Sequence, residues 1–529
     1  MFHKFKIKMA NILCTVKKYQ SYRSYSAKNE NQSLFNIFHQ KLDMPFHETK
    51  RLMNKYSSIR NSPPAILSQN ISYMMEYGFT KEEISKKPQV ISLHPLTLKN
   101  YIMLLEESGF YKDKINPLVI SRFKNLRKKS IESLKAERFI DRNINVQHHI
   151  LSFLQFPSDK YPKKFNDSHT LTEVQENIFK LYVIWKIQID YSDIEQALKV
   201  YHRLHNKSLR LIERSIDILI NDLNFNFEKI KRHSYLIHSD PDNMLELLNF
   251  KELCGMDIKT VLTKHPKIIL TPYESIQEIQ KHLKDFGVPE SALSKVPEIY
   301  TLGSNSVYER LCILKKTPEL ETLMSNPQVA RLLFYMKKVN LRLKYLQNKN
   351  CVSLNLLSSN NRSFNRFNNS GNDKVTSNDI MHFLTSELNQ NKQKLRKHFQ
   401  RHMYWQYISL LRIRQTYESL RSKHFTIENI RDNVHILLYP MYKIDDALVD
   451  IQNMENVTYL RDSTGKIKSE FVLPLVLYSL EKTHHFSGNG VWSVDEHSKQ
   501  LLSSTSSQNL FKDTEELDHV PSPCIMNMD

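Results

Sequence analysis

Glycine and cysteine are both scarce in this chain of 529 residues, which contains nine glycines and five cysteines. So few glycines disfavour folds rich in β-turns and folds that bind nucleotides through glycine-rich loops. The cysteines lie far apart and form no Cys-x-x-Cys pair, so neither a disulfide framework nor a zinc site is expected. No apolar run approaches the roughly 20 residues of a membrane span. No segment alternates for long with the period of a strand, so we expect an all-α protein.

Sequence motifs of enzymes are missing as well. The chain has no G-x-G-x-x-G, P-loop, G-x-S-x-G or H-E-x-x-H motif. The adjacent pairs His148–His149 and His484–His485 would point to different faces of a helix and make poor joint metal ligands. We therefore predict a protein that is not an enzyme and that holds no metal and no cofactor.

The chain does contain a repeated unit of about thirty residues. Clear copies begin at Gly78, Gly255 and Gly287, and a weaker copy begins at Asn224. In the clear copies a short helix with apolar spacing ends at a proline, four residues after an apolar side chain. These pairs are Ile84/Pro88, Leu262/Pro266 and Leu293/Pro297.

Each part of this unit has a physical reason. Glycine or asparagine can take the left-handed conformation that closes a preceding helix. Proline lacks an N–H donor and stops the short helix, and it pushes the residue before it out of helical geometry, so a 3₁₀ turn is expected. A longer amphipathic helix then leads to the next copy, as Ile276, Ile279 and Leu283 show before Gly287. The pattern predicts an α-solenoid of helix–helix–3₁₀ repeats of about 31 residues.

The net charge of +19 is unevenly distributed. Residues 1–29 carry seven Lys/Arg and no acid, whereas the tail from Val491 carries two Lys against seven Asp/Glu. The rest of the chain is therefore strongly basic, which favours a polyanionic partner, nucleic acid before an anionic membrane surface. A basic surface that binds nothing is the alternative.

Composition and periodicity divide the chain into six parts. They are a mitochondrial transit peptide at 1–29 with processing near Arg23–Ala27, an N-terminal helical cap at 30–66, a repeat array at 67–347, a disordered insert at 348–378, basic helical repeats at 379–483, and an acidic disordered tail at 484–529. A disordered basic arm is the alternative for the first part. The insert holds ten asparagines and has little apolar surface to bury. Within the array, 157–170 is predicted to be a polar linker, and periodicity is degenerate over 171–223.

The repeats resemble the mitochondrial transcription termination factor (mTERF) family. The resemblance rests on the pairs Gly78–Phe79 and Gly109–Phe110, on the six-residue step from glycine to an aliphatic residue, and on the Lys-x-Pro cluster. It covers most of 67–345 and returns weakly at 380–480. It implies a curved, half-doughnut superhelix whose concave basic face binds double-stranded mitochondrial DNA. Members of the family arrest or modulate transcription, and some act on ribosomal RNA and ribosome assembly.

Cations recur around the proline turn and the helix after it. Equivalent positions of a solenoid line one edge, so recurrent cations would form a stripe that suits a phosphate backbone. The candidate contacts are Lys86, Lys87, Lys124, Arg127, Lys128, Lys231, Arg232, Lys264, Lys267, Lys315, Lys316, Lys337, Lys338, Arg342, Arg396, Arg401, Arg412 and Arg414. The alternative for any one of them is an ordinary solvated helix residue.

The segment Lys392–Lys423 is the most basic, with nine Lys/Arg against one acid. Its apolar positions fit a core stripe, namely Leu395, Phe399, Met403 and Leu410. Trp405 and Tyr407 could stack on bases, but aromatic residues at helical spacing are more often part of a core.

The sequence thus predicts a monomeric protein of the mitochondrial matrix nucleoid that regulates transcription by occupying duplex DNA. About nine stacked units would follow roughly 20–25 base pairs. Two alternatives remain at this point. One is a ribosome-assembly factor that binds ribosomal RNA, and the other is a scaffold that docks on another DNA-bound mitochondrial transcription factor.

Overall fold

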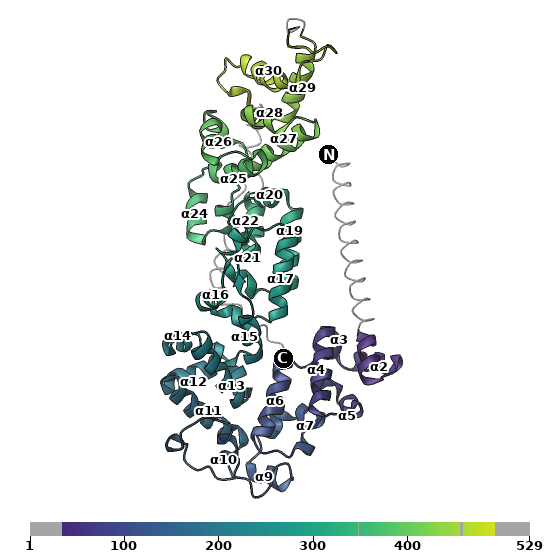
Figure 1. Cartoon of the computed structure of the whole chain (residues 1–529), viewed down its shortest axis with the longest axis vertical. Helices are drawn as coiled ribbons and strands as arrows, with labels where there is room; N and C mark the ends of the chain where they lie inside the picture. Colours follow the sequence, from purple (N-terminus) through teal and green to yellow (C-terminus); the bar gives the residue numbers. More distant parts are fainter. Residues whose placement is uncertain (1–33, 347–348, 455–458, 492–529) are drawn as a thin grey trace. The chain divides into compact units, whose positions relative to one another are not determined.

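The structure, a computed structural model, describes residues 34–346, 349–454 and 459–491. These residues are helical apart from turns and one short antiparallel ribbon of β1 (Glu252–Leu253) and β2 (Met256–Asp257), which confirms the all-α prediction. The chain forms two compact units (Figure 1). Unit 1 ends at Phe250 and also takes in Leu262–Leu270, and unit 2 holds Lys251–Val261 and the chain from Thr271 onward.

Unit 1 begins with a helix over residues 34–42. Its further α-helices are α2 (Phe46–Lys55), α3 (Ser57–Asn61), α4 (Pro64–Tyr77), α5 (Lys81–Lys86), α6 (Pro95–Glu107), α7 (Pro117–Ser121), α8 (Phe123–Arg127), α9 (Ile131–Ala136), α10 (Val146–Leu151), α11 (Leu171–Ile187), α12 (Tyr191–Val200), α13 (Leu209–Asp217), α14 (Phe227–Arg232) and α15 (Pro241–Leu248). Its 3₁₀ helices are η1 (Pro88–Ser92), η2 (Lys112–Lys114), η3 (Ser158–Lys160), η4 (His202–Asn206), η6 (Ser234–His238) and η7 (Pro266–Leu270), and η5 (Ile218–Asp222) is a π-helical turn.

Helix α16 (Ile258–Lys264) belongs partly to each unit. The other α-helices of unit 2 are α17 (Tyr273–Asp285), α18 (Glu290–Leu293), α19 (Ser304–Lys316), α20 (Pro318–Glu321), α21 (Ala330–Phe334), α22 (Met336–Leu346), α23 (Leu354–Ser358), α24 (Asn361–Asn369), α25 (Ser377–Leu388), α26 (Lys392–Phe399), α27 (Leu410–Ser422), α28 (Ile427–Asp432), α29 (Met441–Gln452) and α30 (Ser469–Lys482). Its 3₁₀ helices are η8 (Pro297–Thr301), η9 (Trp405–Tyr407), η10 (Val434–Leu438) and η12 (Asn489–Val491). The long helices α17 and α19 pack side by side (Figure 1).

The copy that begins at Gly78 shows how the sequence produces the unit. Gly78 closes α4 in the left-handed region, at a φ of 112°. Thr80 then caps α5 in a capping box with Glu83, and Ile84 of this short helix is fully buried. The residue before the proline, Lys87, leaves helical geometry at φ −137° and ψ 63°, and the 3₁₀ helix η1 follows. The predicted helix–helix–3₁₀ order is thus confirmed in this copy.

Two further copies lack the glycine that marks the unit in the sequence. Gln188 and His424 occupy the left-handed position, with φ values of 53° and 66°. A buried isoleucine stands six residues later in each, Ile194 and Ile430, and the 3₁₀ helices η4 and η10 follow. The region 171–223, predicted to be degenerate, therefore contains a complete unit.

Polar side chains fasten the 3₁₀ helices to neighbouring long helices. The Asn70 amide on α4 donates to the carbonyl oxygens of Ile91 (2.8 Å) and Leu93 (2.6 Å), the fourth and sixth residues counted from the start of η1. Equivalent carbonyls are bound in other copies, where Lys207 donates to Ile237 and Ser239, Asn243 to Ile269, and Thr416 to Tyr439. These hydrogen bonds satisfy carbonyls that a helix end leaves open, and they fix the backbone of each turn.

In unit 1 the long helices also meet partners far along the chain. The buried Glu107 carboxylate on α6 accepts from the backbone N–H of Leu209 at 3.0 Å and from the Arg210 guanidinium at 3.1 Å, and so caps α13. Burial raises the pKa of Glu107, against the lowering effect of these hydrogen bonds. Lys99 of α6 pairs with Asp242 of α15. Unit 1 is therefore held by contacts between helices about a hundred residues apart, which the repeat pattern did not predict.

The prediction of a disordered insert at 348–378 is wrong. Its described part forms α23 and α24, and Leu354, Leu357 and Phe364 are buried. The Arg342 guanidinium donates to the carbonyl oxygens of Leu356 (2.9 Å) and Ser359 (2.7 Å) and holds the segment against α22. The composition is poor in apolar residues, but those present face the core and a buried arginine satisfies the backbone.

The chain ends predicted as a transit peptide and as an acidic tail lie almost wholly outside the described residues. Residues 484–491 of the predicted tail are described, and Gly490 and Val491 are buried in η12, so this part of the disorder prediction is wrong. The predicted polar linker at 157–170 contains η3 and is tied back by Gln147, whose amide donates to the Pro162 carbonyl at 3.0 Å.

Candidate nucleic-acid interface

Basic residues stand where each short helix meets its 3₁₀ helix. Lys86 ends α5, Lys231 and Arg232 end α14, and Lys264 ends α16. In unit 1 the 3₁₀ helix η6 packs against both η4 and η7, so the basic ends of successive copies lie next to one another. Backbone geometry therefore repeats the position of these cations from copy to copy.

The surroundings of His233 show that the cations of adjacent copies come together. Burial lowers the pKa of His233, and the charges of Lys229, Arg232 and Lys267 lower it further. Lys229 and Arg232 come from α14, whereas Lys267 belongs to the next copy, in η7. This group of Lys229, Arg232, His233 and Lys267, the η6–η7 cluster, is a concentration of positive charge at one edge of unit 1.

The predicted contact residues differ in exposure. Eleven are exposed, namely Lys86, Lys124, Lys128, Arg232, Lys264, Lys267, Lys315, Lys316, Lys337, Arg401 and Arg412. Five are half-buried, namely Lys87, Lys231, Lys338, Arg396 and Arg414. Arg127 and Arg342 are buried. The eleven exposed residues remain predicted contacts with nucleic acid.

Arg127 and Arg342 are wrong as predicted contacts. The Arg127 guanidinium donates to the side-chain oxygens of Gln175 (2.7 Å) and Asn206 (2.6 Å), and burial lowers its pKa to about 10. Arg342 stacks over the Phe364 ring at 4.3 Å while it binds the α23 carbonyls. Both side chains join helices inside the protein, so neither is available to a phosphate.

Two half-buried candidates are engaged by acids. Lys231 lies 2.6 Å from the Asp193 carboxylate, and Arg414 lies 3.1 Å from Glu321 and 2.6 Å from Glu418. A phosphate would have to displace these carboxylates, so both residues contribute less to a nucleic-acid interface than the exposed cations.

Two cations at equivalent positions were missed in the sequence. Arg203 in η4 is exposed, and its positive charge lowers the pKa of both His94 and His238, after burial as the main cause. Lys295, two residues before Pro297, is exposed as well. The signal for Arg203 was Ile194, an aliphatic residue six positions after the left-handed Gln188, in a copy without glycine or proline. Lys295 lies in the clear copy that begins at Gly287, and its position two residues before Pro297 was the signal.

Aromatic residues of the basic segment 392–423 lie mainly in the core. Trp405 is buried, as expected, and so are Leu395, Phe399 and Leu410. The prediction for Met403 is wrong, because its side chain is 66% exposed. The helix is interrupted between α26 and α27 by a turn and η9, so the helical spacing that placed Met403 in the core does not continue through it.

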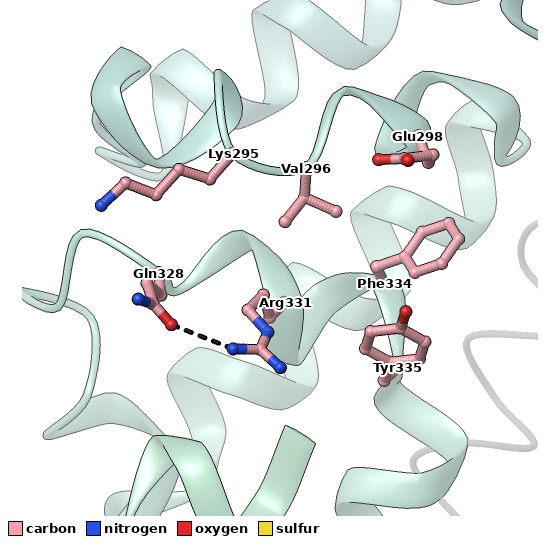
Figure 2. A pocket seen from close by; sticks show the side chains of 7 residues that line it. All are labelled: Lys295, Val296, Glu298, Gln328, Arg331, Phe334 and Tyr335. Atoms are coloured by element: carbon pink, nitrogen blue, oxygen red, sulfur yellow. Dashed lines mark hydrogen bonds between the residues drawn. The ribbon is translucent and has the colours of Figure 1, made fainter. Parts of the chain in front are cut away.

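Unit 2 has a hollow of about 350 Å³ beside η8. Figure 2 shows Lys295 and Val296 on one wall, Gln328 and Arg331 on the facing wall, and the rings of Phe334 and Tyr335 below Glu298. The Arg331 guanidinium donates to the Gln328 side-chain oxygen at 3.1 Å. The hollow is thus lined by two cations and two aromatic rings, next to a basic turn.

The described residues contain no group of three His, Cys, Asp or Glu placed to hold a metal ion. The Nδ1–H of His149 donates to the Glu107 carbonyl oxygen, 2.9 Å away. Cys254 is a free, buried thiol whose pKa is raised to about 12 by burial. None of the helices in the described ranges is long and apolar enough to cross a membrane.

The fold and this edge of cations define an α-helical repeat protein with basic turns. No protein-family model matches the chain. The chain is 29% identical over 451 residues to "Transcription termination factor 5, mitochondrial" of Drosophila melanogaster, a match that covers 83% of this chain and 80% of the relative. The chain is therefore similar in sequence to a protein named as a mitochondrial transcription termination factor, and its helix–helix–3₁₀ units agree with the predicted resemblance to that family.

Proposed function

We propose that this protein acts in mitochondria and regulates transcription by binding duplex DNA through the cations of its 3₁₀ turns. The name of the Drosophila relative supports the compartment and the process. The observation that carries the proposal is the η6–η7 cluster, where Lys229, Arg232 and Lys267 from successive copies act on one histidine.

The physical argument concerns spacing and rigidity. Duplex DNA carries about one negative charge per 1.7 Å of its axis, so a ligand gains affinity when several cations are held in a row. The carbonyl bonds from Asn70 and Asn243 fix η1 and η7, and therefore fix the residues that flank them. Cations held by ordered backbone lose less entropy when they meet a phosphate than cations on a mobile arm. Phosphate contacts of this kind position a protein on DNA without reading its sequence.

A pair of charge-removing variants tests the proposal. Arg232→Gln with Lys267→Gln removes two charges from the η6–η7 cluster, and Lys50→Gln with Arg51→Gln removes the same charges from exposed positions on α2. Binding of the full chain to a duplex of 25 base pairs should weaken roughly tenfold for the cluster pair at physiological salt. The α2 pair should weaken it no more than about twofold, through long-range charge alone.

The competing functions give different results in the same assay. Tighter binding to a structured ribosomal RNA fragment than to the duplex, at equal salt, would indicate the ribosome-assembly alternative. Weak binding to both would indicate a scaffold that needs another DNA-bound factor. Equal losses for the two variant pairs would contradict the proposed interface.

A further inference from the structure

A second group of cations lies in unit 2, between the η8 turn and the hairpin of α25 and α26. Lys392 is the first residue of α26, and its ammonium lies 3.0 Å from the Asn378 side-chain oxygen and 3.2 Å from Nε2 of His382. The Nε atom of Arg396, one turn along α26, is buried and has no hydrogen-bond partner among the described residues. Lys295, which lines the hollow in Figure 2, is close enough for its charge to act on His382.

The positive charges of this group act on one another. Burial lowers the pKa of His382, and the charges of Lys392, Lys295 and Arg396 lower it further. Burial also lowers the pKa of Lys392, with Arg396 acting in the same direction and Asp379 against it. The four side chains, Lys295, His382, Lys392 and Arg396, thus form one site, here called the α25–α26 cluster.

Among the described residues, the carboxylate whose charge acts on Lys392 is Asp379, and it is engaged elsewhere. Asp379 is buried, and its two oxygens accept from the Asn326 amide at 2.6 Å and from the backbone N–H of Leu354 at 2.9 Å. The first turn of α26 contains no acid, although the positive end of a helix dipole favours one. Lysine at that position is electrostatically unfavourable unless an anion is bound beside it.

We propose that the α25–α26 cluster is a phosphate-binding site that holds a phosphodiester of the bound nucleic acid. The Lys392 and Lys295 ammonium groups and the half-buried Arg396 guanidinium supply positive charge and donors from two parts of the chain, and the N-terminus of α26 adds its dipole. An oxyanion with several acceptor oxygens suits such a set of donors better than a single carboxylate. This assignment rests on the proposed function and extends it to a defined site in unit 2.

The test follows the His382 ring by NMR in the full chain, labelled at histidine and assigned with His382→Gln. The duplex of 25 base pairs should raise the His382 pKa by about one unit, because a phosphate offsets the neighbouring cations. Lys295→Gln with Lys392→Gln should weaken duplex binding roughly tenfold. The matched control is Lys281→Gln with Lys284→Gln, two exposed lysines of α17 in the same unit, which should change binding by no more than about twofold.

The possible results distinguish failure of the α25–α26 cluster as a phosphate site from failure of the proposed DNA-binding function. A duplex that binds without moving the His382 pKa, with equal losses for both lysine pairs, overturns the site and leaves the proposed function standing. If the duplex does not bind but inorganic phosphate raises the His382 pKa, the cluster is an anion site for another ligand and the nucleic-acid assignment falls. No response to either probe overturns both.

Discussion

Two copies of the repeat, residues 78–93 and 188–207, reach the same local structure from different sequences. Gly78 and Gln188 both take the left-handed conformation, and Ile84 and Ile194 are both buried six residues later. The 3₁₀ helix begins at a proline, Pro88, in the first copy, but it begins at His202 in the second. The comparison teaches that the left-handed residue and the buried aliphatic define the unit, whereas glycine and proline only make it easier to form.

The largest effect is expected from a charge in the buried position of either copy. Ile84→Asp and Ile194→Asp should each lower the free energy of unfolding by about 4 kcal/mol, because each buries an unpaired carboxylate. The measurement is urea unfolding followed by circular dichroism. Exposed Lys86→Asp is the control for the first copy. A small effect at Ile194 alone would show that the second copy is not an equivalent unit.

The asparagine-rich segment provides the opposite case, a region that looks disordered in sequence but is packed. Arg342→Gln should destabilise the protein by about 3 kcal/mol, since it leaves buried carbonyl oxygens of α23 without a donor. Limited proteolysis should then cut within residues 353–369. The exposed Lys344→Gln on the same helix should leave both measurements unchanged. Replacement of the segment by a Gly/Ser linker without loss of stability would restore the prediction of a disordered insert.

The copy that begins at Asn224 can be tested by the pH dependence of stability. Burial lowers the pKa of His238, at the end of η6, from its ordinary 6.5 to about 4. The unfolded chain therefore binds the proton more readily, and stability is present above about pH 6.5 and is lost as the pH falls toward 4. From pH 7 to 4.5 this group should remove about 2.5 kcal/mol. His238→Asn should make the decrease smaller by that amount, and an unchanged decrease would contradict the assignment.

The smallest effect concerns the left-handed residues themselves. Gly78→Ala should destabilise by about 1 kcal/mol, because nothing lies within 4 Å of the added Cβ and only the backbone conformation is penalised. Gln188→Gly should have the opposite sign, with a gain of a few tenths of a kcal/mol to about 1 kcal/mol. Thermal unfolding measures both changes. The same sign for the two variants would mean that the two positions are not equivalent.

The repeat could be predicted in the copies whose residues strongly prefer the backbone conformation that they adopt. Gly78, Pro88 and Ile84 identify a copy because each has a strong local preference. The copy at Gln188 was missed because a left-handed residue other than glycine is only modestly unfavourable and gives no clear sequence signal. The burial of Arg127 could not be predicted, since its acceptor Gln175 lies 48 residues away in sequence. The exposed cations at the turns stay predicted contacts, whereas the prediction was wrong for Arg127 and Arg342, which long-range packing takes into the core.

The central claim is that cations repeated at the 3₁₀ turns bind the phosphates of a duplex, and the salt dependence of binding tests it most directly. Each neutralised phosphate releases condensed counterion, so six to ten contacts predict a log–log slope of roughly −5 to −9. Replacing Lys86, Arg232, Lys264 and Lys267 with glutamine should make that slope shallower by roughly three to four units if all four contact phosphates. Helicity should be unchanged, because all four side chains are exposed. A slope near zero for the unaltered protein, or the same slope for the variant, would contradict the account.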